Sequence, residues 1–149
     1  MPEGPPPRAV LFACAMNSVR SPMAAALMKH LFPQGVYVAS AGVHRGEPDP
    51  FAVTVMDEIG LDISKHQPRT FADLDDSSFD LVVTLAPEAH HHALELTRTM
   101  AMDVEYWPTS NPMDASGSRD QILDAYRSLR ESLLARLKRR FAWSPMQAG

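Results

Sequence analysis

Cys14 is the only cysteine of this 149-residue chain, and Arg20 follows it six positions later. The apolar run 9–13 precedes the thiol, and Ser21-Pro22 follows the arginine. This pattern predicts a turn between a strand and a helix, because proline favours the first turn of a helix. There the thiol can act as a nucleophile, since a helix N-terminus and a nearby cation favour the thiolate. Backbone N–H groups and the guanidinium can hold the oxygens of a tetrahedral anion.

Two other interpretations of Cys14 exist. A free cysteine after an apolar strand is often a small buried hydrophobe. The string 11–14 also resembles a lipidation signal, but its apolar stretch is short and follows Glu3 and four prolines. A signal peptide instead needs a basic start and roughly 7–15 apolar residues. The complete Cys-x5-Arg-Ser-Pro string favours the nucleophile over both.

Composition predicts a single globular domain. Hydrophobic residues make up 45% and charged residues 21% of the chain, as in ordinary soluble domains. The net charge of −4 argues against a nucleic-acid partner, and no stretch approaches the ~20 apolar residues of a membrane span. We expect one domain over 8–141 with disordered tails at 1–7 and 142–149. A lone cysteine and no signal segment predict the cytoplasm.

The pattern of apolar residues predicts alternating strands and helices. Short apolar runs indicate strands at 8–13, 36–39, 79–85 and 104–107. Longer segments have helical spacing at 21–32, 51–59, 87–97 and 119–141, the last with a capping box from Ser118 and Gln121. This alternation predicts a three-layer α/β fold, a four-stranded parallel sheet flanked by helices. Ligands bind at the carboxyl ends of such strands, where the loop 14–20 lies.

The sequence predicts no metal and no cofactor. His90, His91 and His92 are consecutive on a helix, so they point about 100° apart and form a solvated face. The acidic cluster of Asp73, Asp75 and Asp76 lacks the glycine and glutamate of a calcium loop and is interpreted as a polar loop.

Several strings follow one another in order: 14–22, 40–42, 60–64, 66–69, 79–84, and Trp107 with Asn111-Pro112. Together they resemble the low-molecular-weight protein tyrosine phosphatase family, which includes related arsenate reductases. The resemblance spans Arg8 to about Phe141. It implies a four-stranded parallel sheet with a phosphate-binding loop after the first strand.

The resemblance also implies roles for single residues. Cys14 would form a phosphocysteine, Arg20 would clamp the phosphoryl oxygens, and Ser21 would hydrogen-bond the thiolate. The remaining loop residues would bind substrate: Ala15, Met16, Asn17, Ser18 and Val19. Asn17 would adopt a left-handed conformation, which asparagine tolerates. His66 would brace Asn17, and Ser40 would support the site.

The chain departs from the family pattern at the general acid. Asn111 stands where the family has an aspartate before proline, and an amide cannot transfer the proton. Losing a general acid typically lowers the rate 10²- to 10⁴-fold. Asp114 could substitute if its loop shifted, and Asn111 alone is also an ordinary turn residue before proline.

Further departures concern thiols and the loop walls. Ala86 and Val19 stand where relatives carry further cysteines, so arsenate reduction would need an external thiol. Met16 replaces a glycine of the loop, and Met113 replaces an aromatic residue that would grip a phenyl ring.

The leading hypothesis is hydrolysis of phosphomonoesters, phosphotyrosine or aryl phosphates, through a phosphocysteine. Arsenate reduction with an external thiol and a non-catalytic oxyanion-binding or sensor module are the alternatives. The expected partners are phosphate or arsenate and a phosphorylated small molecule or protein, with no nucleic acid and no membrane.

Overall fold

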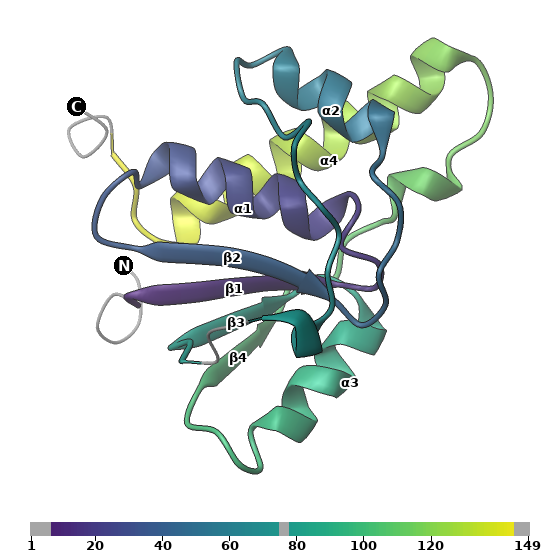
Figure 1. The fold of residues 1–149 in the computed structure, drawn as a ribbon. Coiled ribbons are helices and arrows are strands. Elements are labelled where there is room, and N and C mark those ends of the chain that lie inside the picture. The colour runs from purple at the N-terminus through teal and green to yellow at the C-terminus, as the bar shows by residue number, and fades with distance from the viewer. Residues whose placement is uncertain (1–6, 75–77, 145–149) are drawn as a thin grey trace.

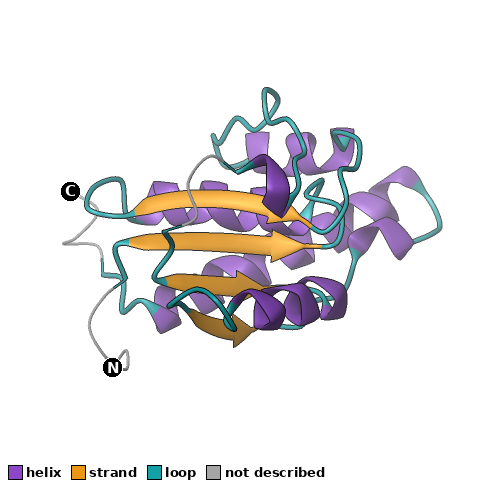
Figure 2. Ribbon diagram, turned by 60° about the horizontal axis from the view of Figure 1, so that its bottom comes forward, coloured by secondary structure: helices purple, strands orange, loops and turns teal. Residues whose placement is uncertain are grey.

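The computed structural model describes residues 7–74 and 78–144. Its centre is a parallel sheet of four strands: β1 (Ala9–Cys14), β2 (Tyr37–Gly42), β3 (Leu81–Thr84) and β4 (Asp103–Tyr106). The strand order is β2-β1-β3-β4, and Figure 2 shows all four running in one direction. The predicted α/β fold with a four-stranded parallel sheet is confirmed.

Helices cover both faces of this sheet (Figure 1). They are α1 (Arg20–Leu31), α2 (Pro50–Asp57), α3 (Pro87–Leu96) and α4 (Arg119–Arg140), with short 3₁₀ turns η1 (Phe71–Asp73) and η2 (Pro112–Asp114). Figure 1 shows α1 and α4 on one face and α3 on the other. None of the helices in the described ranges is long and apolar enough to cross a membrane.

Alternating side chains of β1 serve the two faces, as the pleat of a strand requires. Val10 and Phe12 pack in the larger core, together with residues of α1, α2 and α4. Leu11 and Ala13 pack in the smaller core, together with alanines of α3. Because Cys14 points to the same face of β1 as Val10 and Phe12, the thiol lies on the α1 side of the sheet.

Local capping explains where the longest helix begins. The Ser118 hydroxyl accepts from the Gln121 N–H, and the Gln121 side chain accepts from the Ser118 N–H, so the predicted capping box is confirmed. Within the predicted C-terminal tail, Trp143 packs against the core, and its backbone N–H donates to the Lys138 carbonyl at 2.9 Å. The rest of the predicted tails, 1–6 and 145–149, lies outside the described residues.

The histidines of α3 differ from the predicted solvated face. His90 stacks on Tyr106 at 4.6 Å, and its Nδ1 lies 3.0 Å from the Thr84 hydroxyl. His92 packs against Phe71 at 4.4 Å, so only His91 of the three is exposed. Apolar contacts with neighbouring elements therefore account for the two outer histidines.

The acidic cluster is only partly described. Asp73 accepts from the Thr70 N–H at 2.9 Å and caps η1, whereas Asp75 and Asp76 lie outside the described residues. Across the described ranges, no group of three His, Cys, Asp or Glu residues is arranged to hold a metal ion.

Candidate active site

The loop from Cys14 to Arg20 joins the carboxyl end of β1 to the start of α1. The carbonyls of Cys14, Ala15 and Met16 all accept hydrogen bonds from N–H groups of the segment 43–46, at 3.2, 2.8 and 2.9 Å. Carbonyls alternate sides along a strand, so three successive carbonyls that point to the same segment show that the chain has left the strand and forms a curved loop. The segment 43–46 backs the loop along its outer side.

The direction of these carbonyls fixes the direction of the loop N–H groups. Each peptide is planar and trans, so an N–H points opposite to the carbonyl that precedes it. The N–H groups of residues 15–17 therefore point away from the segment 43–46. The Asn17 carbonyl accepts from His66 Nε2 at 2.9 Å, which turns the Ser18 N–H away from His66 in the same manner. Successive N–H groups facing one side make an anion-binding concavity.

Two glycines allow the backing segment to lie this close. A Cβ on Gly42 would stand 2.7 Å from the backbone nitrogen of Asn17 and 2.7 Å from the His44 carbonyl oxygen. A Cβ on Gly46 would collide with the Ser18 hydroxyl and would lie 2.9 Å from the Met16 Cβ. The backbone contacts of Gly42 cannot be relieved by a side-chain rotation, so glycine is required there.

Cys14 begins a chain of buried hydrogen bonds. Its Sγ lies 3.0 Å from the Ser21 hydroxyl, which accepts from Asn17 Nδ2 at 2.8 Å. Because Asn17 donates to the Ser21 oxygen, the one hydroxyl proton is free to point elsewhere. The sulfur at 3.0 Å is a nearer acceptor than the Ala41 carbonyl at 3.4 Å. A proton donated to Sγ stabilises the thiolate.

Asn17 is the hub of the site. It is fully buried and has a φ of 56°, the left-handed conformation that the sequence predicted. Its second Nδ2 hydrogen bond goes to the Ser40 hydroxyl at 3.0 Å, and its Oδ1 accepts from the Arg69 N–H at 2.9 Å. His66 Nε2 must carry a proton, because the carbonyl that it contacts can only accept. The expected contact between His66 and Asn17 is therefore present.

The sequence predicted no role for Arg69, although the segment 66–69 is part of the resemblance to the family. Its N–H holds the Asn17 side chain, and its Nε donates to the Ser40 carbonyl at 3.1 Å. Burial lowers the pKa of His66, the hydrogen bond to Asn17 opposes this, and the positive charges of Arg69 and Lys29 lower the pKa further. His66 is consequently a neutral donor near neutral pH.

Arg20 is 8% exposed, and two backbone carbonyls hold its guanidinium. Nη1 donates to the Leu85 carbonyl at 3.3 Å and to the Thr109 carbonyl at 3.1 Å. The first lies just beyond β3, and the second lies in the loop before η2. These contacts orient the guanidinium beside the loop, and its other N–H groups can serve an oxyanion.

Asn111 and Asp114 lie at the two ends of η2, in the segment that follows Thr109, whose carbonyl holds Arg20. Asn111 caps η2, its Oδ1 accepting from the Met113 N–H at 3.1 Å. Asn111 and Asp114 line a hollow against α4, next to Ala125 and Ser128. Asp114 thus lines the hollow against α4, whereas its neighbour Met113 lines the cavity beside the phosphate-binding loop.

The residues that do meet beside the loop are the two unexpected methionines. Met16, 39% exposed, and Met113, 53% exposed, line one cavity of about 630 Å³ with Ser18 and Phe51. The buried pair of Tyr126 and Asp49 also lines it, with the tyrosine hydroxyl donating to the carboxylate at 2.7 Å. Val19 is buried in the larger core, whereas the Ala15 side chain is half-buried.

Residues 9–140 match the profile of the family described as low molecular weight phosphotyrosine protein phosphatase. The arsenate reductase of Shouchella clausii is 33% identical over 132 residues, covering 87% of this chain and 92% of its own. The arsenate reductase of Bacillus subtilis is 32% identical over 130 residues, covering 87% and 91%.

Solved structures show the same fold. An arsenate reductase in a phosphate-binding state superposes with a TM-score of 0.71 at 26% identity, covering 91% of this chain and 97% of its own. A tyrosine phosphatase of Erwinia amylovora superposes with a TM-score of 0.75 at 20% identity, covering 95% and 97%.

Proposed function

This chain belongs to the low molecular weight phosphotyrosine protein phosphatase family, and we propose that it hydrolyses phosphomonoesters, phosphotyrosine or aryl phosphates, with Cys14 as the nucleophile. The observation that carries the proposal is the 3.0 Å contact between Cys14 Sγ and a Ser21 hydroxyl whose oxygen already accepts from Asn17. That arrangement favours a thiolate at the base of a loop whose N–H groups face inward.

The reaction proceeds in two displacements. The thiolate attacks phosphorus, the bond from phosphorus to the ester oxygen breaks, and the phosphoryl group becomes bonded to Cys14. Water then attacks the phosphocysteine, releases inorganic phosphate and restores the thiolate. The N–H groups of residues 15–18 and the Arg20 guanidinium bind the three non-bridging oxygens, whose charge they stabilise in both transition states.

The leaving group must depart without a strong acid. The Asn111 amide has no acidic proton to give, and its Oδ1 is engaged with Met113. Asp114 lies at the other end of η2 from Asn111, so it could act in place of Asn111 only if this loop shifted. The rate then depends on how readily the leaving oxygen carries negative charge, so aryl phosphates with acidic phenols react much faster than phosphotyrosine.

The test is hydrolysis of p-nitrophenyl phosphate and phosphotyrosine by the parent protein, Cys14→Ser and Asn111→Asp. We expect turnover of p-nitrophenyl phosphate that disappears in Cys14→Ser. Asn111→Asp should raise the rate on phosphotyrosine by 10²-fold or more, the usual contribution of a general acid. Equal rates on the two substrates would contradict the inference that the general acid is missing. No turnover by either the parent or Asn111→Asp would overturn the proposed phosphatase activity.

A second candidate is arsenate reduction by an external thiol such as glutathione, favoured by the sequence relatives named arsenate reductase. Cys14 would displace water from arsenate and form a thiol ester of arsenic. One external thiol would attack Sγ, releasing arsenite and leaving a mixed disulfide, and a second would restore Cys14. Two thiols thus become one disulfide as As(V) becomes As(III).

The external thiol is required because Cys14 is the only cysteine. Ala86, at the N-cap of α3, supplies no sulfur. Arsenite should therefore form only when glutathione is added, and Cys14→Ser should form none. Absence of arsenite with every thiol tried would exclude this reaction.

A further inference from the structure

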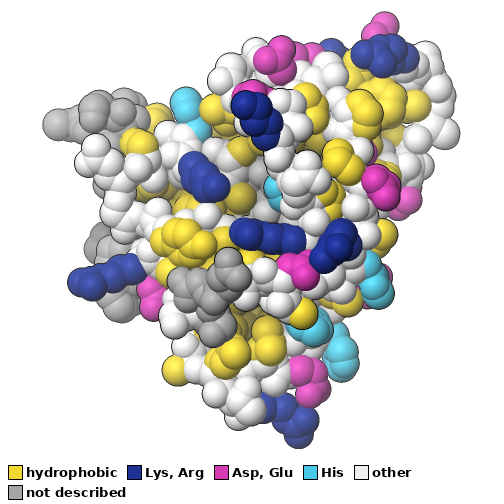
Figure 3. Space-filling view, in the orientation of Figure 1, with side chains coloured by type: hydrophobic (Ala, Val, Ile, Leu, Met, Phe, Trp, Pro, Cys, Tyr) yellow, Lys and Arg dark blue, Asp and Glu magenta, His cyan; other side chains and the backbone are white. Residues whose placement is uncertain are grey.

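A second cavity, of about 720 Å³, shares only Arg45 with the lining of the cavity of Met16 and Met113. Its walls come from α1, from β2 and from the segment 62–69. Figure 3 shows Lys and Arg side chains spaced around this face of the molecule. A volume of this size is typical of sites for small molecules.

The lining is positively charged in a chain whose net charge is −4. Its cationic members are Lys29, Arg45, Lys65 and Arg69. Two carboxylates oppose them, and one of these, Asp73, is paired with Arg45 at 2.6 Å. The other is Asp62, whose pKa is lowered chiefly by hydrogen bonds with Ser64 and also by the charge of Lys65. An excess of two positive charges gathered around one concavity repels itself and attracts anions.

The floor of the cavity suits a compact ligand. It is formed by small apolar side chains, Ala25 and Ala26 of α1 and Ala39 of β2. Arg69 uses its Nε on the Ser40 carbonyl, which leaves four other N–H donors on its guanidinium. An anion on this floor would lie between lysines from two different elements.

The cavity wall is also the support of the catalytic loop. Three of its lining residues form hydrogen bonds with Asn17, namely Ser40, His66 and Arg69. The positive charges of Arg69 and Lys29 already contribute to lowering the pKa of His66, so charges in this cavity act on the imidazole that holds the Asn17 carbonyl.

We propose that this second cavity binds a small molecule with two or more anionic groups. The bound molecule would alter the hydrogen bonds that His66 and Arg69 make to Asn17. Phosphoryl and carboxylate groups share the required chemistry. The site needs no turnover, so it can be present or absent independently of the proposed phosphatase reaction.

The test is a titration of the ¹⁵N-labelled protein with pyrophosphate and, separately, with citrate, followed by NMR in 50 mM salt. We expect the amides of residues 25–29 and 62–69 to shift with one dissociation constant. Lys29→Gln combined with Lys65→Gln should weaken that constant at least tenfold, because two charge-assisted contacts are lost. Arg98→Gln combined with Arg139→Gln removes equal charge elsewhere and should change it less than twofold.

The His66 imidazole supplies a separate readout. A bound anion stabilises the imidazolium, so the pKa of His66 should rise in the presence of the probe that binds. The proposal is overturned if neither probe shifts residues 62–69. It is also overturned if the shifts persist unchanged in the lysine double variant, because they would then be transmitted from the phosphate-binding loop.

Discussion

Ser21 has one hydroxyl proton, and its oxygen accepts a hydrogen bond from the Asn17 amide at 2.8 Å. We predict that Ser21→Ala lowers kcat about tenfold or more and slows alkylation of Cys14 by iodoacetate at pH 7. The reason is the loss of a hydrogen bond to a charged group. Ser40→Ala is the matched control, because its hydroxyl contacts Asn17 and not the sulfur. Equal effects of the two substitutions would contradict direct donation from Ser21 to Cys14.

His66 should make stability depend on pH. Its pKa is lowered in the folded protein from an ordinary value of about 6.5, chiefly by burial. The unfolded chain therefore binds a proton more readily, and stability is lost as pH falls below about 6.5. We predict that urea midpoints of the parent drop between pH 7.5 and pH 5, and that His66→Gln reduces this drop. An unchanged drop in His66→Gln would mean that other groups cause it.

The residues of the site differ in how far the sequence predicted them. Cys14, Asn17 and Ser21 lie within one short string, so their meeting requires only a tight turn. The carbonyls that hold Arg20 lie 65 and 89 positions away. Every residue carries a carbonyl, so no residue type in the sequence marks the ones that are used.

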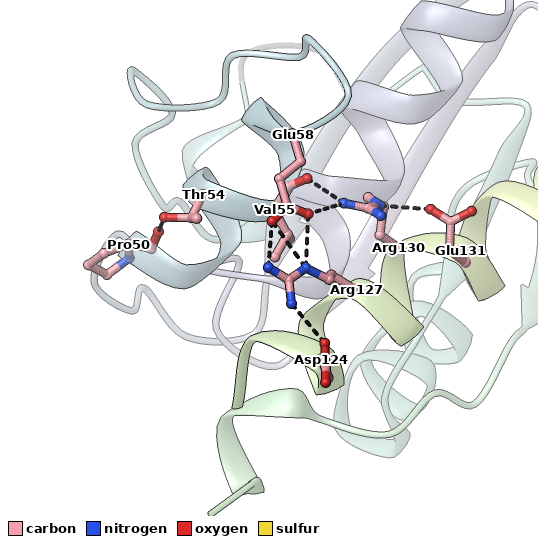
Figure 4. A network of polar contacts seen from close by, with 8 residues as sticks. All are labelled: Pro50, Thr54, Val55, Glu58, Asp124, Arg127, Arg130 and Glu131. Carbon is pink, nitrogen blue, oxygen red and sulfur yellow. Dashed lines mark hydrogen bonds and ion pairs between the residues drawn. The ribbon is translucent and has the colours of Figure 1, made fainter. Parts of the chain in front are cut away.

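At the scale of elements, a network of ion pairs ties the end of α2 to α4 (Figure 4). Glu58 accepts from Arg127 Nη2 at 2.7 Å and from Arg130 Nη1 at 2.8 Å. Arg130 Nη1 also donates to the Val55 carbonyl at 2.7 Å, so the arginine is hydrogen-bonded to the backbone of α2 as well. This attachment sets the position of α2, whose Phe51 forms a wall of the cavity beside the loop.

The network should confer acid sensitivity. Hydrogen bonds from Arg127 and Arg130 lower the pKa of Glu58 from 4.5 to about 2. The depressed value means that the stabilisation is complete above about pH 4.5 and is lost as pH falls towards 2. We predict that Glu58→Gln lowers the melting temperature at pH 6 and that its difference from the parent shrinks by pH 3. Salt should also shrink it, because these groups are partly exposed.

The matched control is Glu47→Gln, which removes an exposed carboxylate without an ion pair in the described part of the chain. It should leave the melting temperature nearly unchanged at both pH values. A difference for Glu58→Gln that stays constant from pH 6 to pH 3 would show that the arginines do not bind the charged carboxylate.

The whole molecule should respond to an oxyanion by mass action. Phosphate that binds only the folded chain adds about 2.7 kcal/mol at a hundredfold excess over its dissociation constant. We predict a rise in melting temperature with phosphate that is mostly lost in Arg20→Ala. Stabilisation of the parent without turnover of any ester would favour the oxyanion sensor. No stabilisation at tens of millimolar phosphate would argue against an anion site in the loop.

The overall architecture was predictable because periodicity is a local property. Alternation of short apolar runs and helical segments sufficed for a parallel sheet covered on both faces. The sequence did not reveal that His90 stacks on Tyr106, since that contact depends on the neighbouring strand in the sheet. It also did not reveal the cationic cavity, whose lysines come from α1 and from the segment 62–69.

The anion cradle is built from peptide groups, and this determines which of its side chains can be exchanged without disturbing it. Exchange of Ala15 or Met16 leaves the direction of the loop N–H groups intact as long as their carbonyls still meet the segment 43–46. Gly42 has no such freedom, because any side chain there would meet the backbone of Asn17. The backbone of the site thus restricts to glycine a position that takes no part in the chemistry. Ala15 and Met16 can thus be exchanged within the loop, whereas Gly42, 28 residues downstream of Cys14, cannot.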